Sequence, residues 1–175
     1  SLEIAISLEE AHPDIDPIFV NFVDLRELIM SLEDFDRPLN DRGKNNAPLM
    51  GKKILTYDLS IKLIISSPAT RAQQTAQLIA KEIGYREELI EYENNLYHGG
   101  IEDFLEALYP HQEETILMFG HNPGIHSFSY WLCEEPKENF PTCGLIFIEI
   151  LRDGWTQVEK NSGRLISFDY PKKLL

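Results

Sequence analysis

The stretch Leu63-Ile64-Ile65-Ser66-Ser67-Pro68, with the segment that follows it as far as Gly84, decides the fold predicted for this chain. Leu63 to Ile65 is a short apolar run typical of a buried strand. Ser67 and Pro68 favour the N-cap and the first position of a helix, and glycine favours the end of one. One helical face of the segment between them is apolar: Ala72, Ala76, Ile79, Ala80 and Ile83. We therefore predict a strand, a turn and a helix.

The same order of signals occurs again later in the chain. Residues 115–119 are an apolar run that predicts a strand, and Gly120-His121 follows it. Asn122 is then the predicted N-cap of a second helix and Pro123 its first residue. The strand–turn–helix unit is thus used twice.

Further patterns complete the predicted architecture. Asn40 is the expected N-cap of a helix through Ala47, Met50 and Ile54, residues 89–92 predict a short strand, and residues 101–108 carry a helical apolar stripe. Three β-rich runs, 144–150, 155–159 and 164–169, are expected to add hairpin-like strands at a sheet edge. Strands that alternate with helices predict an α/β fold of three layers, with a mainly parallel central sheet and flanking helices.

Composition limits the function. The 175 residues, 43% of them hydrophobic, are enough for one core, and we predict a single domain over residues 1–175. A net charge of −13 disfavours nucleic acids and anionic membranes as partners, so an anionic substrate would need a local cluster of arginines. Cys133 and Cys143 have neither the spacing of a metal site nor that of a disulfide framework. No run of about 18 apolar residues occurs, and we expect a cytoplasmic protein.

Polar residues follow both predicted strands where a ligand site is expected. Ligands of open α/β sheets bind outside the carboxyl ends of the strands, near helix N-termini. The first junction brings Ser67 and Arg71, whose guanidinium suits a forked contact with phosphate oxygens. The second brings His121 and Asn122. This pattern predicts an oxyanion site, although ordinary helix starts explain the same residues equally well.

Five motifs resemble, in order and at the usual intervals, those of SixA-type phosphohistidine phosphatases in the histidine phosphatase superfamily. They are residues 34–43 (DFDRPLNDRG), 66–76 (SSPATRAQQTA), 120–124 (GHNPG), 141–144 (PTCG) and 168–173 (FDYPKK). The resemblance extends from about residue 34 to the end of the chain, whereas residues 1–33 match the family poorly.

This resemblance implies a phosphoglycerate mutase-like fold and hydrolysis of a phosphoester or phosphoramidate through a phosphohistidine, without a metal or another cofactor. A phosphorylated protein or a small phosphoester would be the partner. Carried over by position, Arg71 and His121 are the expected catalytic residues, and Arg71 also binds phosphate. Arg37, Asn122 and Ser67 are the further expected contacts to phosphate or substrate.

The nucleophile of this family comes from an Arg-His pair just after the first strand, and this chain contains no such dipeptide. Counting back from Arg37 places the pair at Asn21-Phe22, if the run Ile18–Val23 holds the first strand. If Leu2–Ile6 is the first strand instead, the pair falls near residues 7–9. Neither alignment supplies an imidazole that could carry the phosphoryl group.

Three interpretations of this absence stay open. The chain is a catalytically silent module that binds a phospho-ligand or partner, its N-terminal segment is altered relative to related genes, or another histidine takes over. His98 and His126 are the candidates for that substitution, while His12 and His111 are expected to be solvated. Glu93, Glu102 and Asp103 are candidates for a general acid.

Overall fold

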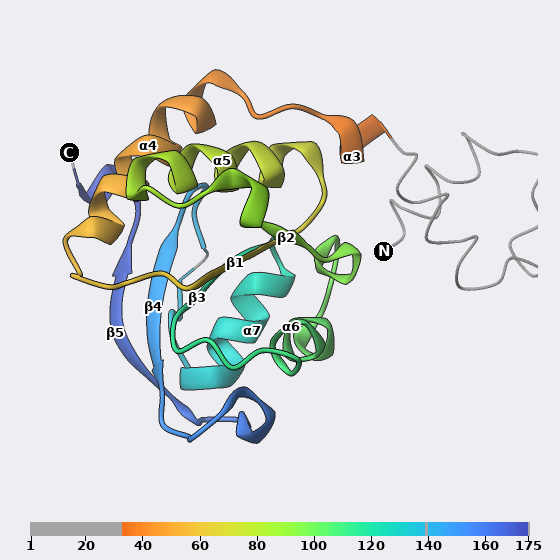
Figure 1. Ribbon diagram of the computed structural model, residues 1–175, viewed down its shortest axis with the longest axis vertical. Helices are drawn as coiled ribbons and strands as arrows, with labels where there is room; N and C mark the ends of the chain where they lie inside the picture. The colour runs from red at the N-terminus through yellow and green to blue at the C-terminus, as the bar shows by residue number, and fades with distance from the viewer. Residues whose placement is uncertain (1–32, 139, 175) are drawn as a thin grey trace, which may run out of the picture.

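The computed structural model describes residues 33–138 and 140–174 as an α/β protein (Figure 1). Both candidates for the opening strand, Leu2–Ile6 and Ile18–Val23, lie outside these residues. The helices are α3 (Glu33–Asp36), α4 (Asp41–Leu55), α5 (Thr70–Ile83), α6 (Ile101–Leu108) and α7 (Gly124–Cys133). The strands are β1 (Leu63–Ser66), β2 (Glu91–Tyr92), β3 (Ile116–Phe119), β4 (Leu145–Ile150) and β5 (Gly163–Asp169). None of the described helices is long and apolar enough to cross a membrane.

The central sheet is parallel, as predicted. β1 lies between β2 and β3 and pairs in parallel with both. Leu63 pairs with Ile116 and Ser66 with Phe119, so β1 and β3 end at the same edge of the sheet. The residues after each strand are therefore neighbours, although 54 positions separate Ser67 from His121.

Helices cover both faces of this sheet, which confirms the three-layer arrangement (Figure 1). Ile64 points toward the α5 face and packs with Ala76 and Ala80, and Met50 and Ile54 of α4 extend this layer. Leu63 and Ile65 point the other way, to Phe104 of α6 and Phe128 of α7. A strand buried on both faces needs apolar residues at successive positions, which is the pattern of Leu63 to Ile65.

The predicted helix boundaries are partly right. Asn40 is the N-cap of α4 and accepts a hydrogen bond from the Gly43 amide at 2.9 Å. Gly84 ends α5 in the left-handed conformation, with φ of 72°. However, α5 begins at Thr70 rather than at Pro68, because Ala69 is extended (ψ 134°), and α7 begins at Gly124 with Pro123 as its N-cap. In both cases the proline precedes the first helical turn.

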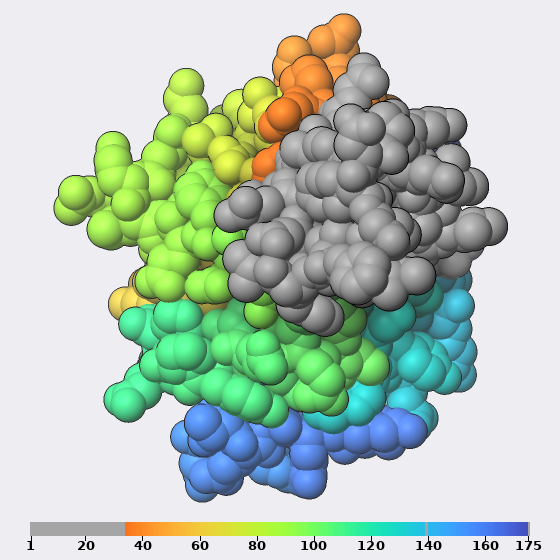
Figure 2. Space-filling model, turned by 90° about the vertical axis from the view of Figure 1, so that its right-hand side faces the viewer, coloured from red at the N-terminus to blue at the C-terminus, as the bar shows by residue number. Residues whose placement is uncertain are grey.

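The C-terminal part differs from the prediction in two respects. Within the described residues, β4 and β5 pair with each other in antiparallel fashion as a separate two-stranded sheet, rather than extending the edge of the parallel sheet. The run 155–159 is not a strand, since Trp155–Gln157 forms a 3-10 turn (η3). The Trp155 indole N–H donates to the Glu113 carbonyl oxygen at 2.9 Å and holds this turn near α6, as the adjoining surfaces in Figure 2 show.

Candidate functional site

Ser67 lies where β1 passes into α5, and its side chain is completely buried. Its backbone N–H donates to the Phe119 carbonyl oxygen of β3 at 2.9 Å, which continues the parallel ladder one residue beyond the strand. Its Oγ accepts a hydrogen bond from the Ala69 amide at 3.3 Å. The serine is therefore fixed by the sheet on one side and by the start of the helix on the other.

His121 lies at the corresponding position after β3, and its Nε2 is 2.8 Å from Ser67 Oγ. This contact joins the two strand–helix junctions that the sequence predicted to meet. Burial, and then the nearby side chains of Arg71 and His98, lower the pKa of His121 to about 4. The imidazole is consequently neutral near pH 7 and can accept or donate a hydrogen bond without carrying charge.

Arg71 stands in the first turn of α5 and is held by α3. Its Nη2 lies 3.2 Å from Asp34 Oδ2, and its Nη1 donates to the Asp34 backbone carbonyl oxygen at 2.7 Å. The second oxygen of the same carboxylate, Oδ1, lies 3.0 Å from Arg37 Nη2. Asp34 is thus paired with the guanidinium that was expected to bind phosphate. This pairing was not predicted from the sequence.

Tyr97 connects the arginine and the histidine. The Arg71 guanidinium lies 5.9 Å from the centre of the Tyr97 ring, and the His121 ring meets it edge-on at 5.5 Å. Phe35 of α3 packs on the same tyrosine at 4.9 Å. Burial, together with the charge of Asp34, raises the pKa of Tyr97, so its hydroxyl stays protonated. Tyr97 was not among the predicted site residues, because its only signal in the sequence is its position next to His98.

His98 lies at the rim of the same site. Its ring centre is 4.2 Å from that of Tyr97 and 6.5 Å from that of His121. Its backbone is left-handed, with φ of 56°, and burial and Arg71 lower the pKa of the imidazole. The next residue, Gly99, touches the start of α7 through its backbone, because a Cβ placed on Gly124 would overlap the Gly99 carbonyl oxygen.

The remaining predicted residues have other partners. Arg37 is exposed and paired with Asp34. The Asn122 side chain donates to the Phe140 carbonyl oxygen at 2.7 Å, and the N-cap of α7 is Pro123 rather than Asn122. His126, the other candidate for a replacement histidine, has its Nε2 3.0 Å from the Pro136 carbonyl oxygen. Asp103 accepts from the Gly100 amide at 2.7 Å and so serves the start of α6. Within residues 33–138 and 140–174, no cluster of three histidine, cysteine or acidic side chains has the geometry of a metal site.

Comparison with known proteins supports the α/β class that these elements define. The family described as histidine phosphatase superfamily (branch 1) matches residues 31–111. A solved structure assigned as phosphohistidine phosphatase SixA of Agrobacterium tumefaciens is 26% identical, with a TM-score of 0.64 over 81% of this chain and 88% of that chain. The structure of protein histidine phosphatase SixA with tungstate has a TM-score of 0.69 at 22% identity, over 82% of this chain and 90% of that one.

An uncharacterised protein of Mycobacterium tuberculosis is also similar, with 26% identity over 81% of this chain and 93% of the relative. Residues 31–111 thus match the histidine phosphatase superfamily, and the fold of the described residues is that of the solved SixA-type structures.

A second family overlaps the first. The family described as iron-sulphur cluster assembly matches residues 1–44. In addition, an uncharacterised protein of Pseudomonas aeruginosa is 56% identical over 34 residues, which are 19% of this chain and 52% of that protein. The poor resemblance of residues 1–33 to the phosphatases thus coincides with a match to another family.

Proposed function

We propose that the chain binds the phosphoryl group of a phosphorylated protein or a small phosphoester between Arg71, Ser67 and His121. The observation that carries this proposal is the 2.8 Å contact between His121 Nε2 and Ser67 Oγ, at the point where two parallel strands end. Arg71 packs against the tyrosine ring that His121 also touches. A histidine, a hydroxyl and a forked cation together suit a tetrahedral oxyanion.

The charges indicate how such an anion would bind. Asp34 has to release Arg71, because a carboxylate and a phosphate compete for the same N–H groups. His121 is neutral in the free protein, and a dianion beside it favours the imidazolium form. We therefore expect binding to be accompanied by uptake of a proton on His121.

Hydrolysis of the bound group is the reaction that similarity to this superfamily suggests, and the nucleophile decides whether it occurs. In the family route a histidine attacks phosphorus while the leaving group departs, and water then cleaves the phosphohistidine. Asn21 and Phe22, which stand at the position counted for the Arg-His pair, cannot make this bond. Of the described histidines, His98 lies beside His121 and is the candidate for a replacement.

Binding without turnover is the second candidate function, and the absence of an Arg-His dipeptide favours it. Two assays on the same variants separate the two functions. Tungstate binding, measured by calorimetry, reports the anion site, and hydrolysis of p-nitrophenyl phosphate and of a phosphohistidine peptide reports turnover. The variants are Arg71→Ala, His121→Ala and His98→Ala, with Arg86→Ala, an exposed arginine paired with Glu88, as the control.

Hydrolysis that is lost in Arg71→Ala and His121→Ala would establish an enzyme, and its loss in His98→Ala would identify the replacement nucleophile. Tungstate binding without hydrolysis, abolished by Arg71→Ala but kept by Arg86→Ala, would establish the binding module. If the unmodified chain binds no tungstate and hydrolyses neither substrate, the assignment of the site is wrong.

The cytoplasmic location remains a prediction, based on two cysteines that are both free.

A further inference from the structure

The Asp34 carboxylate holds the place of an anion beside Arg71. Its Oδ2 lies 3.2 Å from Arg71 Nη2 and accepts a hydrogen bond from the Tyr97 hydroxyl at 3.4 Å, and its Oδ1 lies 3.0 Å from Arg37 Nη2. A phosphoryl group likewise presents several oxygens on one centre, and a guanidinium binds carboxylate and phosphate in the same forked way. The groups that hold Asp34 are therefore the groups that an anion meets when it displaces this side chain.

The Tyr97 hydroxyl depends on Asp34 as the acceptor of its proton. Tyr97 is buried, with 8% of its surface exposed, and among the described residues the acceptor of its hydroxyl is Asp34 Oδ2. Arg71 lies close to the same hydroxyl, but a guanidinium only donates hydrogen bonds and cannot replace the carboxylate. Because Oδ2 faces both Arg71 and Tyr97, a movement of Asp34 away from the arginine also takes the acceptor from the tyrosine. A buried donor without a partner is costly, so the hydroxyl then needs a new acceptor.

Packing around the Tyr97 ring fixes the position of its hydroxyl. The centres of the Phe35 and His121 rings lie 4.9 and 5.5 Å from that of Tyr97, both edge-on, and the centre of the His98 ring lies at 4.2 Å. The backbone is held as well, because the Tyr97 amide donates to the Asn94 carbonyl oxygen at 3.1 Å. Burial raises the pKa of Tyr97 and so keeps the hydroxyl protonated. A donor fixed in this way needs no reordering when an anion arrives.

We propose that the Tyr97 hydroxyl is a ligand of the bound anion and donates to one of its oxygens in the place that Asp34 leaves. This inference rests on the proposed function and adds a phosphate-binding residue to Arg71, Ser67 and His121. The tyrosine already lies beside two of these side chains, since its ring is 5.9 Å from the Arg71 guanidinium and meets the His121 ring edge-on. The anion and the carboxylate thus exchange places, and the buried hydroxyl has an acceptor in both states.

A purely supporting role for the hydroxyl predicts the opposite effect on binding. If Tyr97 does no more than hold Asp34 against Arg71, loss of the hydroxyl frees the arginine and tungstate binds more tightly. If the hydroxyl is a ligand of the anion, its loss weakens binding, and it does so even in a chain that lacks the Asp34 carboxylate. The sign of the change therefore distinguishes the two roles.

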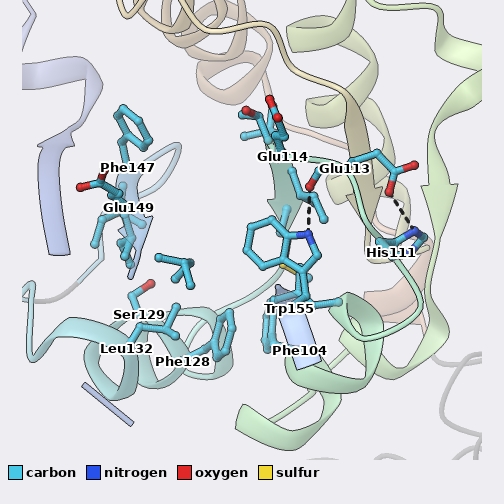
Figure 3. Close-up of a pocket in the computed structure, with 18 of the residues that line it drawn as sticks. Phe104, His111, Glu113, Glu114, Phe128, Ser129, Leu132, Phe147, Glu149 and Trp155 are labelled. Carbon is cyan, nitrogen blue, oxygen red and sulfur yellow. Dashed lines mark hydrogen bonds and ion pairs between the residues drawn. The ribbon is translucent and has the colours of Figure 1, made fainter. Parts of the chain in front are cut away.

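Tungstate is a suitable probe because the large cavity of this protein repels it. A cavity of about 850 Å³ lies between β3 and β4, and Figure 3 shows Glu113, Glu114 and Glu149 among the residues that line it. Arg152 also lines the cavity but is paired with Glu159. Carboxylates repel a dianion, and the side chains of the anion site do not line this cavity. A change in tungstate affinity therefore reports the site at the ends of β1 and β3.

The test is a double-mutant cycle on the full chain with Tyr97→Phe and Asp34→Ala. Phenylalanine keeps the ring and its packing, and alanine leaves no side-chain acceptor at position 34. By calorimetry, Tyr97→Phe should weaken tungstate binding about tenfold in the Asp34→Ala background, as expected for the loss of a hydrogen bond to a charged group. In the unmodified chain Tyr97→Phe should also weaken binding. Tyr85→Phe is the matched control and should change nothing, because its hydroxyl donates to the Leu89 carbonyl oxygen at 3.1 Å, beyond the end of α5 opposite to Arg71.

Tighter binding in Tyr97→Phe, or the same affinity of Asp34→Ala with and without Tyr97→Phe, would overturn the proposal and leave Tyr97 as a support for Asp34. An equal loss of affinity in Tyr85→Phe would overturn it as well, since that hydroxyl lies far from the anion site. Arg71→Ala tests the proposed function separately. Tungstate binding that requires Arg71 but not the Tyr97 hydroxyl would refute the role of Tyr97 alone, whereas no binding by the unmodified chain would refute the anion site itself.

Discussion

Removal of the Asp34 charge should strengthen anion binding, because Asp34 forms an ion pair with Arg71, which the anion needs as its own partner. Asp34 Oδ2 lies 3.2 Å from Arg71 Nη2, and the two side chains are 46% and 21% exposed. At an effective dielectric constant of about 20, two unit charges about 4 Å apart attract by roughly 4 kcal/mol. For a pair this exposed, solvent screening and side-chain entropy leave about 1 kcal/mol. Asp34→Asn should therefore raise the affinity for tungstate at least about fivefold, and more where the carboxylate also repels the bound dianion.

Calorimetry at low and high salt measures this effect, and it should shrink at about 0.5 M salt if it is electrostatic. Asp36→Asn is the matched control, since it removes the same charge from the same short helix. Asp36 is exposed and has no ion pair with another described residue. An unchanged or weaker affinity in Asp34→Asn, or an equal gain in Asp36→Asn, would refute the view that α3 blocks the arginine.

Three further predictions concern pH and stability. The pKa of His121 is about 4 in the folded protein and about 6.5 in the unfolded chain, so the stability present above pH 6.5 should fall by roughly 3 kcal/mol as the pH drops to 4. In His121→Gln no group titrates at this position, so the free energy of unfolding should not show this loss of roughly 3 kcal/mol between pH 6.5 and 4. Tungstate affinity should rise as the pH falls from 7 toward 5, if the anion favours a protonated His121; a flat profile, with His121→Gln as the reference, would contradict this. Tyr57→Phe should cost about 1 to 2 kcal/mol by urea unfolding, because the Tyr57 hydroxyl donates to Asp169 Oδ2 and accepts from Ser167 Oγ, both at 2.6 Å. A cost below about 0.5 kcal/mol would show that these bonds do not hold the segment after α4 to β5.

The parallel sheet and its two strand–helix units could be predicted because local signals and tertiary structure agree there. Leu63 to Ile65 is apolar at every position, and the strand is buried on both faces. The Asn40 side chain caps α4 by a bond to a residue three positions away, and Gly84 ends α5 by its own left-handed backbone. Both helix ends can therefore be predicted from the local sequence. Ser67 and His121 are neighbours because the parallel strands β1 and β3 are paired in register and end at the same edge of the sheet.

Other features depend on partners far away in the sequence. Trp155 belongs to a β-rich run, but its indole bonds to Glu113 and the run forms a turn instead. The Asn122 amide has a partner at Phe140, which no helix-capping rule indicates. Asp34 was visible only as part of a motif, since its contact with Arg71 spans 37 positions. The predicted starts of α5 and α7 are too early because Ala69, which follows Pro68, is not helical (ψ 134°), and because Pro123 is the N-cap of α7 and not its first residue.

The close approach of Gly99 and Gly124 has a consequence for what the site can admit. These glycines bring the loop that carries His98 into main-chain contact with the start of the helix that follows His121. The distance between the two imidazoles is thus set largely by two backbones in contact, and not by side chains that could rotate aside. A methyl group on Gly124 would have to push the loops apart. The spacing of the two loops therefore depends on the side chain that Gly124 lacks.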